Sequence, residues 1–212
     1  MTTYVFIDAS NLFYGGKKSL GWSIDYEKLK HYLETKYEAA QVFYFGGVET
    51  HKFFFDYINL ESIPIRELQE YLKDLVLKNN GTITNTELEL IHTHLKRVQF
   101  YVKLEKLGYR LILKPVKTYY THTGDKVRKA NCDVDMTYTM MRERNAFDKI
   151  LVLSGDGDFL PVLKHLRSKN KEVIVLSRSE RTAKEIKQFA GGEFRDFHYI
   201  KKHIQFENKN DL

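Results

Sequence analysis

The feature that most constrains the fold is a pair of fully apolar segments in the C-terminal half of the 212-residue chain. Residues 150–153 (ILVL) and 173–176 (VIVL) are short and apolar throughout, which is typical of strands buried on both faces. Between them, residues 159–168 place apolar side chains at helical spacing. A strand, a helix and a second strand in this order form a β-α-β unit with parallel strands. The sequence therefore predicts an α/β fold built on a mainly parallel sheet.

The remaining periodicity extends this pattern along the chain. We expect further strands at residues 4–7, 41–45 and 109–113, a last short strand or turn at 197–200, and helices at 25–37, 65–76, about 85–102, 136–144 and around 182–189. A polar loop is expected between 115 and 133. No repeat or flexible linker divides the series, so we interpret residues 1–205 as one domain with a doubly wound sheet, a helical insertion at about 56–95, and a polar tail at 206–212.

Composition restricts the functional classes. Cys132 is the single cysteine, so a disulfide within the chain is impossible and a cysteine-based zinc site is not expected. His92 and His94 are two residues apart and cannot share a helix face, so a histidine zinc site is not expected either. No apolar run is long enough for a membrane span or resembles a secretory leader, which favours a cytoplasmic protein without a membrane partner. The net charge of +6 is compatible with nucleic acid as a partner, and equally with a lysine-rich soluble surface.

Three polar motifs stand at or near the expected strand ends. They contain Asp8, Ser10 and Asn11 after the first strand, Asp133 and Asp135 before a helix, and Ser154, Asp156 and Asp158 after the strand at 150–153. Ligands of doubly wound sheets bind beyond the carboxyl ends of the strands. Carboxylates that converge there repel one another unless a cation offsets their charge, and oxygen ligands without thiolates favour Mg²⁺ or Mn²⁺.

Each motif also has a purely structural explanation. Asp8 could cap the turn after its strand, and Asp133 and Asp135 could be acids that favour a helix start. The third motif could be a turn in which Asp158 caps the following helix. Independent caps have no reason to fall at equivalent sheet ends three times, so the combination favours a site.

These motifs resemble those of NYN-domain proteins in the LabA-like branch of the PIN-like nucleases. The resemblance rests on residues 6–12 (FIDASNL), 100–115, Lys129 with 133–135 (DVD), and 154–161 (SGDGDFLP), and covers residues 4–55 and 96–200. The family often carries a further acid in the helix, near the position of Thr139 in this chain.

The resemblance implies a Rossmann-like, PIN-like fold and a metal-dependent ribonuclease. Asp8 would be the central ligand of one or two Mg²⁺ or Mn²⁺ ions, held together with Asp133, Asp156 and Asp158, and with Asp135 as a further candidate. Asn11 and Ser154 would orient a metal-bound water or a phosphate, or simply form turns. RNA contacts through phosphates and stacked bases are expected from Ser10, Ser154, Lys114, Lys117, Arg128, Lys129, Tyr119 and Tyr120, although a solvated loop would explain any one of the basic and aromatic residues.

Two other functions fit parts of the sequence. Residues 155–158 (GDGD) are similar to the late acidic loop of haloacid-dehalogenase-type phosphatases, but those enzymes need a second aspartate where this chain has Ser10. The third hypothesis is a regulatory module that binds RNA and does not cleave it. The apolar stripes of the two insertion helices could pack on the sheet, or serve a homodimer or a lid.

Overall fold

The computed structural model describes residues 1–14, 21–78, 83–120 and 122–207, apart from the side chains of 13, 14, 119, 120 and 126–129. The chain divides into two compact units, one formed by residues 1–45 and 133–212 and the other by 46–132. None of the helices in the described ranges is long and apolar enough to cross a membrane.

A six-stranded sheet has the order β3-β2-β1-β6-β7-β8. Its strands are β1 (Thr3–Asp8), β2 (Ala39–Val48), β3 (Arg110–Pro115), β6 (Lys149–Leu153), β7 (Glu172–Ser177) and β8 (Phe194–Asp196). The pairs β1–β2, β1–β6, β6–β7 and β7–β8 are all parallel. The predicted α/β class with a doubly wound, mainly parallel sheet is therefore confirmed.

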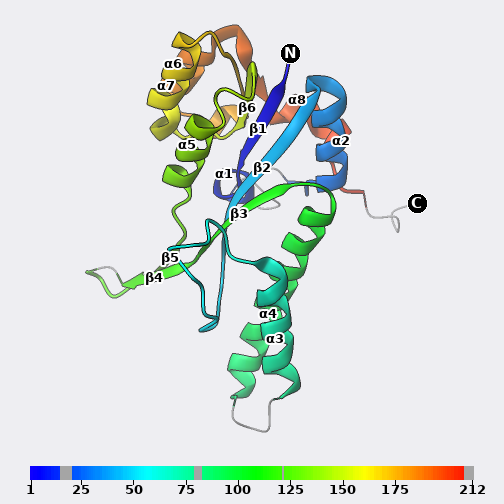
Figure 1. Cartoon of the computed structure of the whole chain (residues 1–212), viewed down its shortest axis with the longest axis vertical. Coiled ribbons are helices and arrows are strands. Elements are labelled where there is room, and N and C mark those ends of the chain that lie inside the picture. The colour runs from blue at the N-terminus through cyan, green and yellow to red at the C-terminus, as the bar shows by residue number, and fades with distance from the viewer. Residues whose placement is uncertain (15–20, 79–82, 121, 208–212) are drawn as a thin grey trace. The chain divides into compact units, whose positions relative to one another are not determined.

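Helices of the first unit lie on both sides of its strands (Figure 1). They are α1 (Ala9–Tyr14), α2 (Tyr26–Tyr37), α5 (Asp133–Arg142), α6 (Leu160–Ser168), α7 (Lys184–Ala190) and α8 (Phe197–Ile204), with short 3-10 turns η2 (Gly157–Phe159), η3 (Ser179–Arg181) and η4 (Gly191–Glu193). Asp25 caps α2 by accepting hydrogen bonds from the backbone N–H groups of Glu27 and Lys28, as expected. The rings of Phe6 and Phe43 stack at 4.9 Å between β1 and β2.

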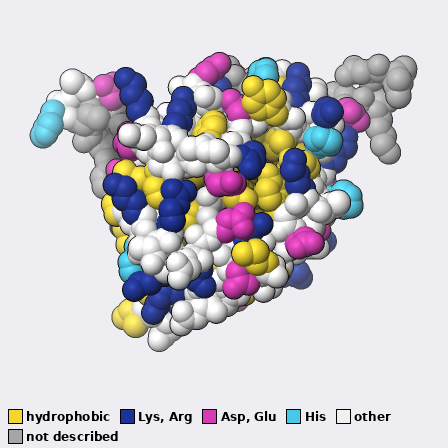
Figure 2. Space-filling model, turned by 90° about the horizontal axis from the view of Figure 1, so that it is seen from above, with side chains coloured by type: hydrophobic (Ala, Val, Ile, Leu, Met, Phe, Trp, Pro, Cys, Tyr) yellow, Lys and Arg dark blue, Asp and Glu magenta, His cyan; other side chains and the backbone are white. Residues whose placement is uncertain are grey.

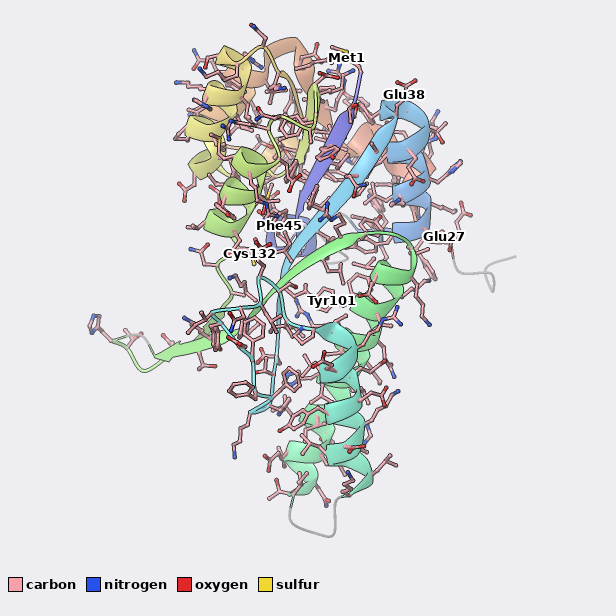
Figure 3. All side chains as sticks on the ribbon, viewed as in Figure 1. Met1, Glu27, Glu38, Phe45, Tyr101 and Cys132 are labelled. Carbon is pink, nitrogen blue, oxygen red and sulfur yellow. The ribbon has the colours of Figure 1, made fainter. Side chains whose placement is uncertain are left out.

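The direction of the strands fixes where a ligand can approach. Figure 3 labels Met1 and Glu38 near the amino ends of β1 and β2, and Phe45 toward the carboxyl end of β2. Asp8 ends β1 in register with Phe45 of β2. Asp8 therefore lies at the carboxyl edge of the sheet, where doubly wound folds bind their ligands.

The second unit contains both helices expected for the insertion. They are α3 (Ile65–Leu77) and α4 (Asn85–Lys106), which pack against each other, and the unit ends in a hairpin of β4 (Lys117–Tyr120) and β5 (Lys126–Lys129). On α4, the hydroxyl of Tyr101, labelled in Figure 3, donates to the Gly47 carbonyl at 2.9 Å. A Cβ on Gly47 would collide with the Ala130 side chain, so a glycine is needed at this point of β2.

Four sequence-based predictions of secondary structure were wrong. Strand β2 does not stop at residue 45 but continues through Gly46 and Gly47 to Val48, and at Gly47 the close approach of Ala130 leaves no room for a Cβ. The segment expected as a loop before residue 133 contains the β4–β5 hairpin. Helix α5 begins three residues earlier than predicted, at Asp133. Residues 197–200 begin helix α8, which is capped by Asp196 and buries Phe197, Ile200 and Ile204.

Candidate functional site

Asp8 is a buried carboxylate, 5% exposed, at the carboxyl end of β1. Its Oδ1 accepts hydrogen bonds from the Ser10 backbone N–H at 2.9 Å, the Ser10 hydroxyl at 2.6 Å and the Asn11 N–H at 3.3 Å. Its Oδ2 accepts one from the hydroxyl of Ser154 at 3.1 Å. The bonds to Ser10 and Asn11 are those of a cap at the start of α1, whereas the bond to Ser154 joins β1 to the end of β6. Asp8 thus has a capping role and also belongs to a wider network.

Ser154 connects the first motif to the third. Its side chain is 3% exposed, and its Oγ also accepts the backbone N–H of Asp156 at 3.2 Å. Asp156 in turn accepts the N–H of Asp158 at 3.0 Å and caps η2. The cap of this turn is therefore Asp156, and the structural alternative in which Asp158 caps the following helix is contradicted. The Asp158 side chain is exposed instead.

Two glycines allow this turn to pack against the start of α7. A Cβ on Gly155 would lie 2.9 Å from the Thr182 Cα, and the Gly155 carbonyl accepts the Ala183 N–H at 2.9 Å. A Cβ on Gly157 would collide with the carboxylate of Glu185. Thr182 and Glu185 are thus neighbours of the motif that sequence reasoning missed. In the sequence, the two glycines indicate that another segment packs closely against this turn, but they do not identify that segment.

Asp133 and Asp135 occupy the first turn of α5 and are partly buried. Helix α5 packs on β1 and on η2, so the elements that carry all three motifs are neighbours in the first unit. At Thr139, where the family often has an acid, the hydroxyl donates to the Asp135 carbonyl at 2.7 Å and the residue is buried. In the described ranges, no three His, Cys, Asp or Glu side chains are placed so that they could share a metal ion.

The chemistry of the donor set nevertheless suits a hard cation. The hydrogen-bond partners described for Asp8 are neutral N–H and O–H groups, so its negative charge is buried without a cation among those partners. Burying a carboxylate is costly unless a positive charge compensates it. The neighbouring motifs offer further carboxylate oxygens, which are the ligands that Mg²⁺ and Mn²⁺ prefer. The donor atoms of these motifs are therefore of the kind that such an ion prefers, while the described side chains are not placed so that three of them could share one.

The basic and aromatic candidates belong to the second unit. Lys114 is partly buried on β3 and Lys117 is exposed on β4. The backbone register of the hairpin pairs Lys117 with Lys129 and Thr118 with Arg128. The side chains of Arg128, Lys129, Tyr119 and Tyr120 lie outside the described part of the structure. Figure 2 shows one face of the molecule on which Lys and Arg alternate with Asp and Glu, so net charge alone does not define an anion-binding face there.

Two histidines of the second unit are in contact. His51 Nε2 meets His94 Nδ1, and the ring centroids are 4.5 Å apart. The sequence argument considered only neighbours on one helix and so missed this pair, whose members are 43 residues apart. No third potential ligand accompanies them among the residues that the structure describes.

The fold and this edge define an α/β domain with three acidic motifs carried by adjoining elements. The NYN domain matches residues 2–198, and the chain belongs to the NYN domain family. Low amplitude and bright protein LabA from Synechococcus elongatus (strain ATCC 33912 / PCC 7942 / FACHB-805) is 29% identical over 129 residues, which cover 56% of this chain and 69% of LabA. The predicted LabA-like resemblance is therefore confirmed.

Solved structures share the fold at low sequence identity. A protein of unknown function, VPA0982 from Vibrio parahaemolyticus RIMD 2210633, superposes with a TM-score of 0.61 and 17% identity, over 97% of this chain and 96% of that one. A flap endonuclease of bacteriophage T5 in complex with DNA and metal ions is more distant, with a TM-score of 0.43 and 14% identity over 91% of this chain and 60% of the endonuclease. The first match shows a common fold over almost the whole chain.

Proposed function

We propose that residues 1–205 form a PIN-like nuclease domain that hydrolyses phosphodiester bonds in single-stranded or structured RNA with the help of Mg²⁺ or Mn²⁺. The observation that carries the proposal is the hydrogen bond between Asp8 and Ser154, which are 146 residues apart. This bond ties two acidic motifs into one network at the carboxyl edge of the sheet. Two unrelated caps would not need such a connection.

The residues have distinct roles in this proposal. Asp8 is the central metal ligand, and the acids of the other two motifs complete the site, namely Asp133, Asp135, Asp156 and Asp158. The ions supply an activated water and positive charge near the phosphate that is attacked. Ser154 orients Asp8 through the bond to Oδ2, and Ser10 does the same through Oδ1. Asn11, partly exposed beside them, is placed to orient a water or a phosphate oxygen.

RNA is the substrate we propose because the chain combines a net charge of +6 with basic and aromatic residues around the β4–β5 hairpin. Lysine and arginine neutralise phosphates, and aromatic rings stack on unpaired bases. A cytoplasmic location and assembly as a homodimer are further parts of the proposal.

The phosphatase alternative is disfavoured by the surroundings of Asp8. That reaction needs an acid two residues after the nucleophilic aspartate. Here the corresponding residue is Ser10, and its hydroxyl donates to Asp8 at 2.6 Å. A hydroxyl that is engaged in this way cannot replace a carboxylic acid as proton donor to a leaving group.

The test is Mn²⁺-dependent cleavage of labelled single-stranded RNA by the wild type and by Asp8→Asn. We expect cleavage to fall at least about 100-fold, because the amide removes the central anionic ligand. Asp25→Asn is the matched control, since Asp25 also caps a helix, α2, but belongs to none of the three motifs. Cleavage that survives Asp8→Asn would contradict the proposal. Phosphate release from a small phosphomonoester would favour the phosphatase, and RNA binding without cleavage at any metal concentration would favour the regulatory module.

A further inference from the structure

The segment between β2 and α3 exposes several large apolar side chains close together in the sequence. Phe54 is 85% exposed, Tyr57 66% and Ile58 93%, and Leu60 is exposed as well. They belong to the second unit, in the cyan loop of Figure 1, and residues 53–60 are called the apolar loop below. Single exposed apolar side chains are normal on a protein, whereas a group of this kind marks an interaction surface.

The inner side of the apolar loop is packed against the second unit. Phe55 is buried, and its ring meets that of Tyr57 edge-on at 4.8 Å. The ring of Phe53 lies 5.5 Å from that of Tyr71 on α3. The Tyr71 hydroxyl donates to the His51 carbonyl at 2.7 Å, just before the loop. The backbone of the loop is thus anchored on α3, so its outer side chains are exposed from a folded segment.

Asp56 fixes the turn within the loop. Its carboxylate accepts the backbone N–H groups of Ile58 at 3.0 Å and Asn59 at 3.1 Å, and the side-chain amide of Asn59 at 2.7 Å. These hydrogen bonds, that of the Asn59 side chain first, lower the pKa of Asp56, so the carboxylate is ionised at neutral pH. Tyr57 and Ile58 stand inside this turn and are held in one arrangement.

The charges around the apolar side chains restrict the partner. Lys52 is exposed and makes no ion pair within the described ranges, and the printed partners of Asp56 are neutral donors. One cation and one anion therefore accompany the loop. Two further acids, Glu49 and Glu61, stand just outside it. A phosphate backbone would meet more negative than positive charge here, which disfavours RNA as the partner.

The exposed area is large enough for a protein contact. The four exposed side chains of the loop present on the order of 500 Å², within the range of the largest apolar patch on a monomer, which is often functional. Two such loops in contact would remove about 1,000 Å² from water, which is roughly the lower limit for a specific interface. The loop can thus support a weak dimer by itself.

We propose that the apolar loop is the contact between two copies of this chain, related by a two-fold axis that passes through the loop. In most homo-oligomers the same patch meets itself across such an axis. This arrangement covers the apolar side chains with their equivalents and brings Lys52 of one copy to Asp56 of the other, twice. The inference rests on the homodimer that forms part of the proposed function, but not on RNA cleavage, because none of the proposed metal ligands lies in the loop.

Sedimentation equilibrium of the full chain tests the inference, and we expect a dimer with a dissociation constant in roughly the micromolar range. Ile58→Glu should raise this constant at least about 30-fold, because it places a charge at the centre of the contact in both copies. Lys52→Gln and Asp56→Asn should each raise it by about fivefold, and the asparagine keeps a side-chain acceptor for the turn. The double variant should be no weaker than either single one, since each already breaks the pair.

Leu77→Glu is the matched control, because it introduces the same charge at an exposed apolar position of α3 outside the loop. It should dimerise like the wild type, and circular dichroism checks that each variant is folded. A dimer that does not cleave RNA would support this inference and reject the nuclease proposal.

Three results would overturn the inference. The first is a wild type that stays monomeric up to about 100 µM, well above the expected dissociation constant. The second is a dimer that Ile58→Glu leaves unchanged, or that Leu77→Glu weakens equally. The third is a monomer whose affinity for a short single-stranded RNA, measured by fluorescence anisotropy, falls in Ile58→Glu, since the loop would then be an RNA surface.

Discussion

Ser154 illustrates at the scale of one residue how the network at the sheet edge is held together. Its hydroxyl donates to Asp8 and accepts the N–H of Asp156, so Ser154→Ala leaves a buried carboxylate oxygen and a backbone donor without this partner. We expect the variant to lose about 1–3 kcal/mol of the free energy of unfolding. Urea denaturation measures the loss. Ser168→Ala is the control, because the Ser168 hydroxyl bonds the His165 carbonyl at an exposed position, and equal losses in the two variants would contradict this account.

Tyr37 makes a second prediction at this scale, concerning alkaline pH. Burial raises its pKa from 10.0 to about 12, so the unfolded chain releases this proton at a lower pH than the folded chain does. The stabilisation that results is fully present below pH 10 and is lost as the pH rises toward 12. Two pKa units correspond to at most about 2.7 kcal/mol, and solvent screening makes the contribution smaller. The difference in free energy of unfolding between the wild type and Tyr37→Phe should therefore change across this interval, and a difference that stays constant with pH would refute the explanation.

At the scale of secondary-structure elements, the turn from β6 into η2 contains two glycines, and replacing them should cost different amounts of stability. Gly155→Ala places a Cβ 2.9 Å from the backbone of Thr182, which cannot move away cheaply, and we expect a loss of about 1–3 kcal/mol. Gly157→Ala meets only the end of the flexible Glu185 side chain, so its cost should be smaller. Gly192→Ala, with open space around it, serves as the control. Thermal unfolding of the three variants gives the ranking, and a Gly157→Ala variant as unstable as Gly155→Ala would contradict it.

The same elements show why the sheet could be predicted from the sequence and some of its edges could not. Strands β6 and β7 are apolar on both faces, and this composition fits few structures other than the centre of a parallel sheet. The hairpin of β4 and β5 is rich in lysine, tyrosine and threonine, which also suits a solvated loop. Residue 47 of strand β2 is a glycine against which Ala130 packs, and this contact between residues far apart in the sequence leaves no local pattern.

The candidate site was predictable to a similar extent. Asp8 and the acids of residues 156–158 could be located because each follows a recognisable strand. The sequence predicted that Ser154 and Asp8 lie at the same edge of the sheet, but it did not predict the hydrogen bond between them. That bond depends on how the side chains of two different strands are positioned. Glu185 was missed because it comes from a later helix, and its position beside Gly157 follows from how α7 packs on η2.

At the scale of the whole molecule, folding and metal binding should be coupled if the acids form one site. An ion that binds the folded chain and not the unfolded one stabilises it by mass action, by about 2.7 kcal/mol at a free concentration 100 times the dissociation constant. For a chain of this size, Mn²⁺ should then raise the melting temperature by about 5–10 °C. Differential scanning calorimetry with Mn²⁺ and with a chelator measures the change without any assay of RNA cleavage. Asp8→Asn should abolish the increase, whereas Asp25→Asn should retain it. An increase of equal size in both variants would place the ion elsewhere on the protein, because the buried Asp8 carboxylate is the ligand that the proposed site cannot lose.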